Sequence, residues 1–363
     1  MEIRRLTPSE MESAIKLSDK TFRKSHHQSM GRAFPLVFST YNNLSFGAFH
    51  DSKLVSFFGL VPFEINIGNA QVSAFSIGSV CTDPEYRGKG IASAILEKIY
   101  QYIDEAGASL LFVSGDRGLY LRNNCFHFGA RNTFKIDKAT YEIENGESEI
   151  VRKGTLGDLF SVFRLRQKKN VRYETSVSEW LTLLKAGGYT SIFNMQQEVY
   201  VMEEKGEITA YVVAGIPKEN SMKTEPIITE WGGEPSNVKS ILESLYIEFK
   251  AFEIKVPWHD DLNKELQKDY EFHSIRNGGT IHIVKARRLI NQILPYLADK
   301  LPRVTEKLSV EFEDIRELKL NYKGESITLT HKEFIETLFS PEDKGFPNLF
   351  PIPLPSTEGM EYV

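Results

Sequence analysis

The residues best suited to chemistry form a glycine-containing loop, Arg87-Gly-Lys-Gly-Ile-Ala92. The loop follows an apolar run, Gln71–Val80, and comes directly before a stretch with helical periodicity. A helix N-terminus has unpaired backbone N–H groups and the positive end of the helix dipole. Glycine lets an anion approach this main chain closely, and Arg87 and Lys89 add positive charge. The pattern predicts a site for a phosphate or pyrophosphate group.

Two familiar phosphate-binding motifs fit this loop poorly. A Walker A loop needs Gly, four residues and then Gly-Lys-Ser/Thr, but Asp83 stands at the first glycine position and Gly90 follows the lysine. A dinucleotide-binding fingerprint needs three spaced glycines directly after a strand. Here Ser93 takes the third position, and Thr82–Tyr86 separates the strand from the loop. A nicotinamide-dependent oxidoreductase, with Asp116 as the acidic residue, is therefore a weaker alternative.

A third motif matches the loop in spacing and in its flanking residues. Val80, Pro84, Arg87, Gly90 and Ala92 fit the signature R/Q-x-x-G-x-G/A with its preceding strand and proline. The segment resembles the acetyl-coenzyme A (acetyl-CoA) site of the Gcn5-related N-acetyltransferase (GNAT) superfamily. The alternative interpretation is an ordinary strand–turn–helix connection.

The resemblance implies a binding mode for acetyl-CoA as cosubstrate. The strand before the loop would splay from its neighbour, and backbone groups of Val80 and Cys81 would pair with the pantetheine amides. Arg87 and Lys89 would add charge-assisted contacts to the pyrophosphate. The N–H groups that would hold the pyrophosphate belong to Gly88, Lys89, Gly90, Ile91 and Ala92.

The same resemblance implies a catalytic tyrosine. Gly115–Cys125 is similar to the last helix and turn of the family, with Asn124 at the glycine position and Cys125 in place of the usual phenylalanine. Tyr120 then corresponds to the tyrosine that protonates the departing coenzyme A thiolate in many relatives. A phenol with an ordinary pKa of about 10 stays protonated at neutral pH and can act as an acid. The alternative is a tyrosine that packs against the cofactor without a chemical role.

The elements around the loop predict a mixed α/β domain over residues 1–142. Thr7–Glu10 reads as a capping box with proline at the first helical position, and Met11, Ile15 and Phe22 should form the buried stripe of its helix. A helix from Ile91 should end at Gly107 and lead to a parallel strand. The expected strands are 44–50, 54–67, 71–80 and 110–114.

Two further domains are expected. Residues 143–286 repeat the order of elements of the first domain, but Trp231–Val238 replaces the pyrophosphate loop and places Glu234 toward the phosphates. We interpret this part as a degenerate GNAT-like domain that binds no cofactor. Residues 287–363 should form a small α+β domain, with a helix over 289–301, a hairpin over 308–328, a capped helix ending at Phe339 and an extended proline-rich tail.

This three-part organisation resembles the enhanced-intracellular-survival (Eis) family, which has tandem GNAT folds and a C-terminal domain like sterol carrier protein. The expected fold class is therefore α/β with a splayed, mixed central sheet. In the Eis family the terminal carboxylate enters the first active site and helps to deprotonate the amine. Val363 would supply that group, with Tyr362 nearby. The alternative is a frayed terminus.

Other candidate groups have simpler interpretations. His26 and His27 follow the first helix and read as a solvated loop. Trp258–Asp261 lacks further spaced metal ligands, so it should cap the next helix. Cys81 has no suitably spaced activating partner and reads as a packing residue rather than a nucleophile.

Composition restricts the class of function. The formal net charge of −5 argues against nucleic acid as a partner, and no apolar run reads as a signal peptide or a membrane span. Two cysteines make neither a disulfide framework nor a zinc site, so no metal is expected. We predict a cytoplasmic enzyme that transfers acetyl to a small-molecule or peptide primary amine by direct attack. The alternative is a non-catalytic acyl-CoA-binding sensor module. Relatives assemble, and the oligomeric state stays open.

Overall fold

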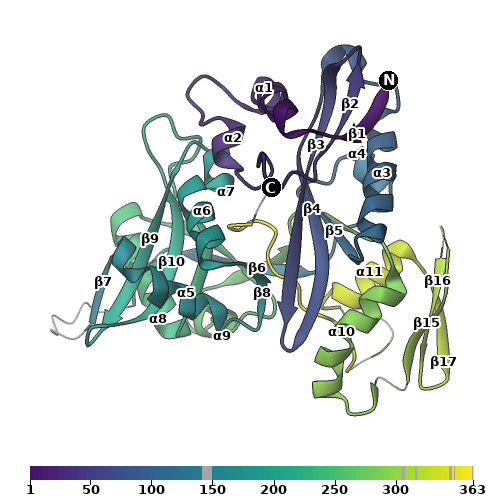
Figure 1. Ribbon diagram of the computed structural model, residues 1–363. Helices are drawn as coiled ribbons and strands as arrows, with labels where there is room; N and C mark the ends of the chain where they lie inside the picture. The colour runs from purple at the N-terminus through teal and green to yellow at the C-terminus, as the bar shows by residue number, and fades with distance from the viewer. Residues whose placement is uncertain (141–148, 305–306, 315–316, 343–345, 347, 362) are drawn as a thin grey trace.

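Within the described residues the chain forms four β-sheets and a set of covering helices (Figure 1). The computed structural model describes residues 1–140, 149–304, 307–314, 317–342, 346, 348–361 and 363. The largest sheet has the order β1-β2-β3-β4-β5-β14, and β8 pairs with β3. Its strands are β1 (Glu2–Arg5), β2 (Phe46–His50), β3 (Lys53–Ile67), β4 (Ala70–Thr82), β5 (Leu110–Val113), β8 (Val171–Glu174) and β14 (Thr280–Ile283).

Helix α3 (Ile91–Glu105) covers one face of this sheet. It crosses from the end of β4 to the start of β5, and this crossover lets the two strands run parallel. The apolar residues that recur at helical spacing are all buried, as the sequence predicts: Ile91, Ile95, Leu96, Ile99 and Ile103. They pack against side chains of β2, β3, β4 and β5 that point to this face.

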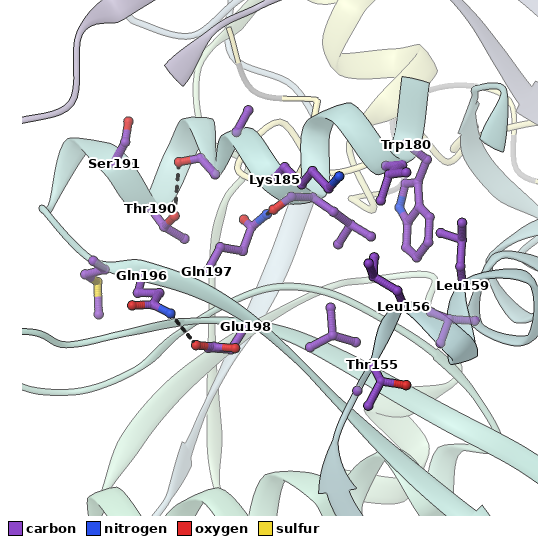
Figure 2. A pocket seen from close by; sticks show the side chains of 18 of the residues that line it. Thr155, Leu156, Leu159, Trp180, Lys185, Thr190, Ser191, Gln196, Gln197 and Glu198 are labelled. Atoms are coloured by element: carbon purple, nitrogen blue, oxygen red, sulfur yellow. Dashed lines mark hydrogen bonds between the residues drawn. The ribbon is translucent and has the colours of Figure 1, made fainter. Parts of the chain in front are cut away.

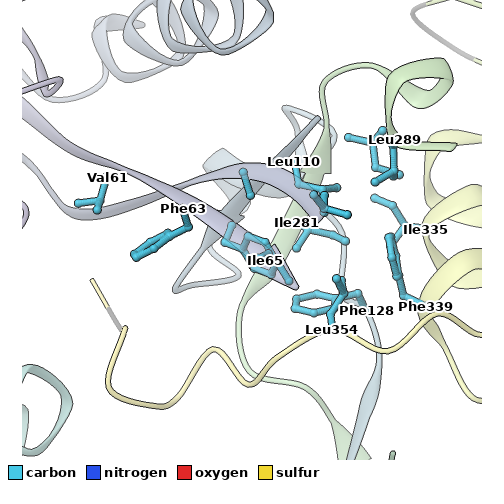
Figure 3. Close-up of a cluster of buried hydrophobic side chains, with 14 of the residues drawn as sticks. Val61, Phe63, Ile65, Leu110, Phe128, Ile281, Leu289, Ile335, Phe339 and Leu354 are labelled. Carbon is cyan, nitrogen blue, oxygen red and sulfur yellow. The ribbon is translucent and has the colours of Figure 1, made fainter. Parts of the chain in front are cut away.

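The opposite face carries α1 (Met11–Phe22), α2 (Met30–Ala33) and elements from the end of the chain. Figure 3 shows Phe63 and Ile65 of β3 in the same buried cluster as Phe128 and Leu289. The expected buried stripe of α1 is wrong at one position. Met11 is buried, but Phe22 is 37% exposed because it ends the helix at the rim of a cavity.

Residues 130–276, apart from β8, form two smaller sheets, and we call this part the second half. One has the order β11-β10-β9-β7 and the other β12-β6-β13. The first comprises β7 (Glu149–Lys153), β9 (Gln196–Glu204), β10 (Glu207–Ile216) and β11 (Ile227–Gly233), and the second β6 (Ala130–Ile136), β12 (Phe252–Pro257) and β13 (Phe272–Arg276). The helices of this half are α5 (Leu159–Gln167), α6 (Val177–Ala186), α7 (Gly188–Ile192), α8 (Pro235–Phe249) and α9 (Leu262–Leu266).

Three strands pair across the expected domain boundary, and one of them is β8, which pairs with β3. β6 lies within the residues expected for the first domain, but it pairs with β12 and β13. In return β14, from the residues expected for the second domain, pairs with β5 of the large sheet. Sheet pairing therefore crosses the expected boundary between 1–142 and 143–286, which itself falls among residues outside those described.

The last part of the chain adds α10 (Ala286–Lys300), β15 (Leu308–Glu313), β16 (Glu317–Tyr322), β17 (Glu325–Thr330) and α11 (His331–Phe339). The expected hairpin with its turn at Lys323 and Gly324 is present as β16 and β17, and β15 adds a third antiparallel strand to it. Between β15 and β16, Asp314 Oδ1 accepts from Glu317 N at 2.9 Å.

The predicted capping box before α1 is present and carries an ion pair. Glu10 accepts from Thr7 N and from both terminal nitrogens of Arg4, each at 2.8 Å. The Arg4 guanidinium lowers the pKa of Glu10 to about 2. The folded protein thus holds this carboxylate charged at pH values where the unfolded chain binds a proton.

We expect Glu10→Gln to lower the free energy of unfolding by about 1 kcal/mol at pH 7. The folded pKa lies below the unfolded one, so this contribution is present above the unfolded pKa and is lost as pH falls toward about 2. Urea unfolding at a series of pH values measures the difference between variant and wild type. A difference independent of pH would contradict the role of this charge, and Glu12→Gln in the exposed Glu12–Lys16 pair is the control.

Candidate active site

The large sheet opens at the C-terminal end of β4. Parallel pairing of β4 with β5 covers only Ala74–Ile77, whereas β4 continues beside β3 to Thr82. Two residues of β4, Ser79 and Val80, lie opposite a single residue of β3, which is a β-bulge, and Ser79 has a φ of 54°. The Ser79 hydroxyl is buried without a hydrogen-bond partner among the described residues. A gap with unsatisfied polar groups therefore separates β4 from β5, as the resemblance implied.

The predicted anion-binding loop lies at the mouth of this gap. Gly88 and Gly90 have φ values of 74° and 75°, and Gly90 directly precedes α3. A Cβ at either position would meet nothing within 4 Å, so backbone conformation rather than crowding selects glycine here. Arg87 Nε donates to Thr82 O at 3.0 Å, which fixes the base of the loop. The exposed N-terminus of α3 is thus open to an anion.

A cavity of about 580 Å³, which we call the active-site cavity, joins the gap to the surface. The predicted site residues that line it are Val80, Cys81, Arg87, Ala92, Tyr120 and Val363. Gly88, Lys89 and Gly90 lie exposed on the adjacent loop. Ile91 is the first residue of α3, and its side chain is buried against the sheet. Any role of Ile91 in binding is therefore limited to its main chain.

Tyr120 reaches the cavity from the short helix α4 (Gly118–Leu121), and the residue is 7% exposed. The turn after it has the expected form, because Asn124 adopts a left-handed φ of 59° and Cys125 N donates to Tyr120 O at 3.1 Å. Tyr100 Oη donates to Asn123 O at 2.9 Å and holds the turn against α3. The phenol therefore stands on a fixed support beside the β4–β5 gap.

Val363 lies in the wall of the same cavity and is 5% exposed. A Cβ added at Gly78 would overlap its main-chain carbon, so the chain passes directly against β4 at the bulge. Sequence reasoning missed Gly78, although a glycine inside a strand pattern is a signal of close backbone approach. Tyr362, expected beside Val363, lies outside the described residues.

Arg23, another residue that sequence reasoning missed, forms part of the cavity wall. Its terminal nitrogens donate to Ser191 O and Ser191 Oγ, each at 3.0 Å, and burial lowers its pKa. This contact connects α1 of the first half with α7 of the second. This wall of the cavity is thus built from both halves.

The remaining candidates offer neither a nucleophile nor a base to this cavity. Burial raises the pKa of the Cys81 thiol to about 11, so it is a poor nucleophile at neutral pH. His26 is exposed, and neither it nor His27 lines the cavity. Asp260 Oδ1 accepts from Leu262 N at 3.0 Å and caps α9, as expected.

Two classes of feature are absent from the part of the chain that the structure describes. It contains no cluster of three or more side chains suited to hold a metal ion. Its helices are all too short or too polar to cross a bilayer.

A second cavity, of about 420 Å³, lies between α6, α7 and β9 (Figure 2). Trp180, Leu156 and Leu159 form its apolar side, whereas Gln196, Gln197 and Glu198 lie across from them. It contains none of the predicted site residues. Ser191, the hydrogen-bond partner of Arg23, lies in its wall, so this contact separates it from the active-site cavity.

Comparisons with known proteins give matches to the same family that the loop and the β4–β5 gap resemble. Residues 2–124 match the family model of the acetyltransferase (GNAT) domain. No curated protein sequence matches the chain significantly. A probable N-acyltransferase of unknown function from Enterococcus faecalis V583 has a similar structure, with 14% identity and a TM-score of 0.64 over 91% of this chain and 84% of that one.

Two other solved structures share the fold. A GCN5-related N-acetyltransferase from Anabaena variabilis is 14% identical, with a TM-score of 0.61 over 92% of this chain and 88% of its own. Eis1 from Mycobacterium abscessus is 12% identical, with a TM-score of 0.55 over 79% of this chain and 75% of its own. Residues 2–124 therefore match a GNAT acetyltransferase domain, and the fold of the chain is similar to that of these solved structures, Eis1 included.

Proposed function

We propose that this enzyme transfers the acetyl group of acetyl-CoA to a primary amine by direct attack on the thioester. The observation that carries the proposal is the β4–β5 gap, which runs from the glycine loop into a cavity that Tyr120 and Val363 line. The gap suits a narrow amide-containing arm, because it holds a bulged strand and a buried Ser79 hydroxyl that has no hydrogen-bond partner among the described residues. The acceptor is a small-molecule or peptide amine that enters between α1 and α7.

The residues of the gap and loop would hold acetyl-CoA as follows. Backbone groups of Val80 and Cys81 would pair with the pantetheine amides. The N–H groups from Gly88 to Ala92 would bind the pyrophosphate, where the α3 dipole favours negative charge. Arg87 and Lys89 lie beside them and would add charge-assisted hydrogen bonds. Bound in this way, acetyl-CoA supplies an activated acyl carbon to the cavity.

Three groups of the chain would then move or stabilise charge. The main-chain carboxylate of Val363, taken as free, would accept a proton from the incoming ammonium group. A backbone N–H of the bulged segment at Val80 and Cys81 would stabilise the tetrahedral oxyanion. Tyr120 would donate its phenolic proton to the departing thiolate. Base and acid would thus both reach the reacting carbon from the cavity wall.

The loop can be tested by binding. Gly90→Ala introduces a side chain at a φ of 75° and at the expected phosphate position, and we expect the Kd for acetyl-CoA, measured by calorimetry, to rise at least about tenfold. Gly107→Ala is the matched control, because Gly107 ends the same helix with a φ of 80° and equally open space. No binding heat for the wild type, or equal losses in both variants, would refute the proposed site. Thiol release with a panel of amines identifies the acceptor.

A further inference from the structure

The second half of the chain contains a gap equivalent to the β4–β5 gap. In the order of elements, β11, α8 and β12 correspond to β4, α3 and β5, but β11 pairs only with β10 and β12 only with β6 among the described residues. The loop before α8 is closed: a Cβ at Gly233 would overlap Thr209 O, and the acidic Glu234 precedes the helix. β11 and β12 are therefore unpaired with each other along their whole length, and the loop beside them has no open anion site.

The chain's own C-terminal segment, residues 350–361 and 363, fills this second gap. Figure 1 shows it entering between the two halves. On the β11 side, a Cβ added at Gly359 would lie 3.2 Å from Thr229 O. On the β12 side, His259 Nε2 is 3.0 Å from Leu354 O. Two small cavities, of about 70 and about 90 Å³, lie along the segment.

Three ion pairs hold the segment at its two acidic residues, Glu358 and Glu361. Glu358 binds Arg131 of β6 at 2.6 Å and Lys255 of β12 at 3.3 Å. Glu361 binds Arg166 of α5, which is 3% exposed. Between these pairs, Met360 is buried in the apolar cluster of α5, α6 and β10. Each anchor joins the segment to a different element of the second half.

Arg166 is the centre of a network that leaves the segment little freedom. Its other nitrogens donate to Glu230 Oε1 at 3.1 Å, to Tyr173 O at 3.1 Å and to Thr175 Oγ1 at 2.7 Å. These partners lie on β11, on β8 and just after β8, and β8 pairs with β3 of the large sheet. The guanidinium therefore connects Glu361, two residues before Val363, to both halves of the protein.

We propose that the second gap holds the C-terminal segment in place of a cofactor, and that Arg131 and Arg166 are positioning residues that keep Val363 in the wall of the active-site cavity. This inference rests on the proposed role of Val363. The second half of the chain then contributes to catalysis without binding acetyl-CoA, because the segment held in its gap positions Val363 in the active-site cavity.

The decisive variant is Glu361→Ala. It removes one anchor and leaves Arg166 paired with Glu230, so the buried charges stay balanced and the fold should persist. We expect backbone amides of 354–361 to exchange hydrogen at least about tenfold faster, measured by mass spectrometry. The kcat should fall about tenfold with an unchanged KM for acetyl-CoA, since a displaced group loses orientation. Glu361→Gln, which still accepts from Arg166, should recover most of both losses.

Glu243→Ala is the matched control. Glu243 is a buried carboxylate of α8 that accepts from Tyr270 and Thr140, away from the C-terminal segment. Its loss should lower the thermal midpoint but leave the exchange of 354–361 and the kcat unchanged. Calorimetry of the wild type should give one acetyl-CoA per chain, and a second equivalent would refute the occupied gap.

The outcomes separate this inference from the proposed function. Wild-type exchange and kcat in Glu361→Ala would overturn the positioning role. Faster exchange with unchanged kcat would also overturn it, and would remove Val363 from the proposed mechanism. A wild-type enzyme that binds acetyl-CoA but acetylates no amine would refute the proposed function, whereas the exchange data would still report whether the segment is anchored.

Discussion

Deletion of Val363 is expected to lower kcat about 10²-fold or more at neutral pH, with little change in the KM for acetyl-CoA. The deletion moves the chain's carboxylate back by one residue, a distance of about 3.5 Å. The ammonium group of the acceptor would then lose its proton only to water. Because free amine becomes more abundant as pH rises, the activity of the deletion variant should climb steadily with pH toward that of the wild type.

The control for this deletion is Val363→Ala. It shortens a buried side chain but keeps the carboxylate in place, so kcat should stay within about threefold of the wild type. Steady-state thiol release between pH 6 and about 10 measures both variants. If the deletion variant kept wild-type kcat and a wild-type pH profile, Val363 would be a packing residue and the base would lie elsewhere.

Replacement of Tyr120 by phenylalanine should lower kcat by about 10- to 100-fold. Only the hydroxyl is lost, so the ring still fills its place in the α3 cluster, and the KM for acetyl-CoA should hardly change. The kcat falls because the coenzyme A thiolate would then depart without a positioned acid to protonate it. Initial rates at saturating acetyl-CoA give kcat, and the thermal midpoint tests that the fold persists.

Tyr102→Phe provides the comparison for Tyr120→Phe. Tyr102 packs against the same apolar cluster from α3 but does not line the active-site cavity. We expect wild-type kcat in this variant. Equal kcat in Tyr120→Phe and Tyr102→Phe would mean that Tyr120 only packs against the cofactor and that solvent protonates the thiolate.

Much of the first half could be predicted because its signals are local. The capping boxes at Thr7 and Thr330 are present, and the stripe of α3 is buried. The two loop glycines have the positive φ values that a helix start of this kind requires. Each of these features depends on residues a few positions apart, so neighbouring sequence carries the information.

The strand exchange could not be predicted, because pairing partners are distant in sequence. β6 pairs with β12 and β13, which lie more than 100 residues later in the sequence. β14 is a short apolar segment, and no feature of its sequence indicates that it pairs with β5. The boundary between β15 and β16 was missed for a different reason: the sequence from Glu313 to Glu317 contains no glycine or proline. The path of residues 354–361 likewise depends on Arg131 and Arg166, whose spatial neighbourhood the sequence does not reveal.

The exchanged strands affect how the protein can be made. The large sheet receives its edge strand β14 from residues 280–283, so a nascent chain cannot complete this sheet until most of the polypeptide has left the ribosome. A fragment limited to residues 2–124 would leave the β5 edge bare, and an unpaired edge promotes aggregation. Expression of the catalytic unit for crystallography or engineering therefore requires a chain that extends at least past β14.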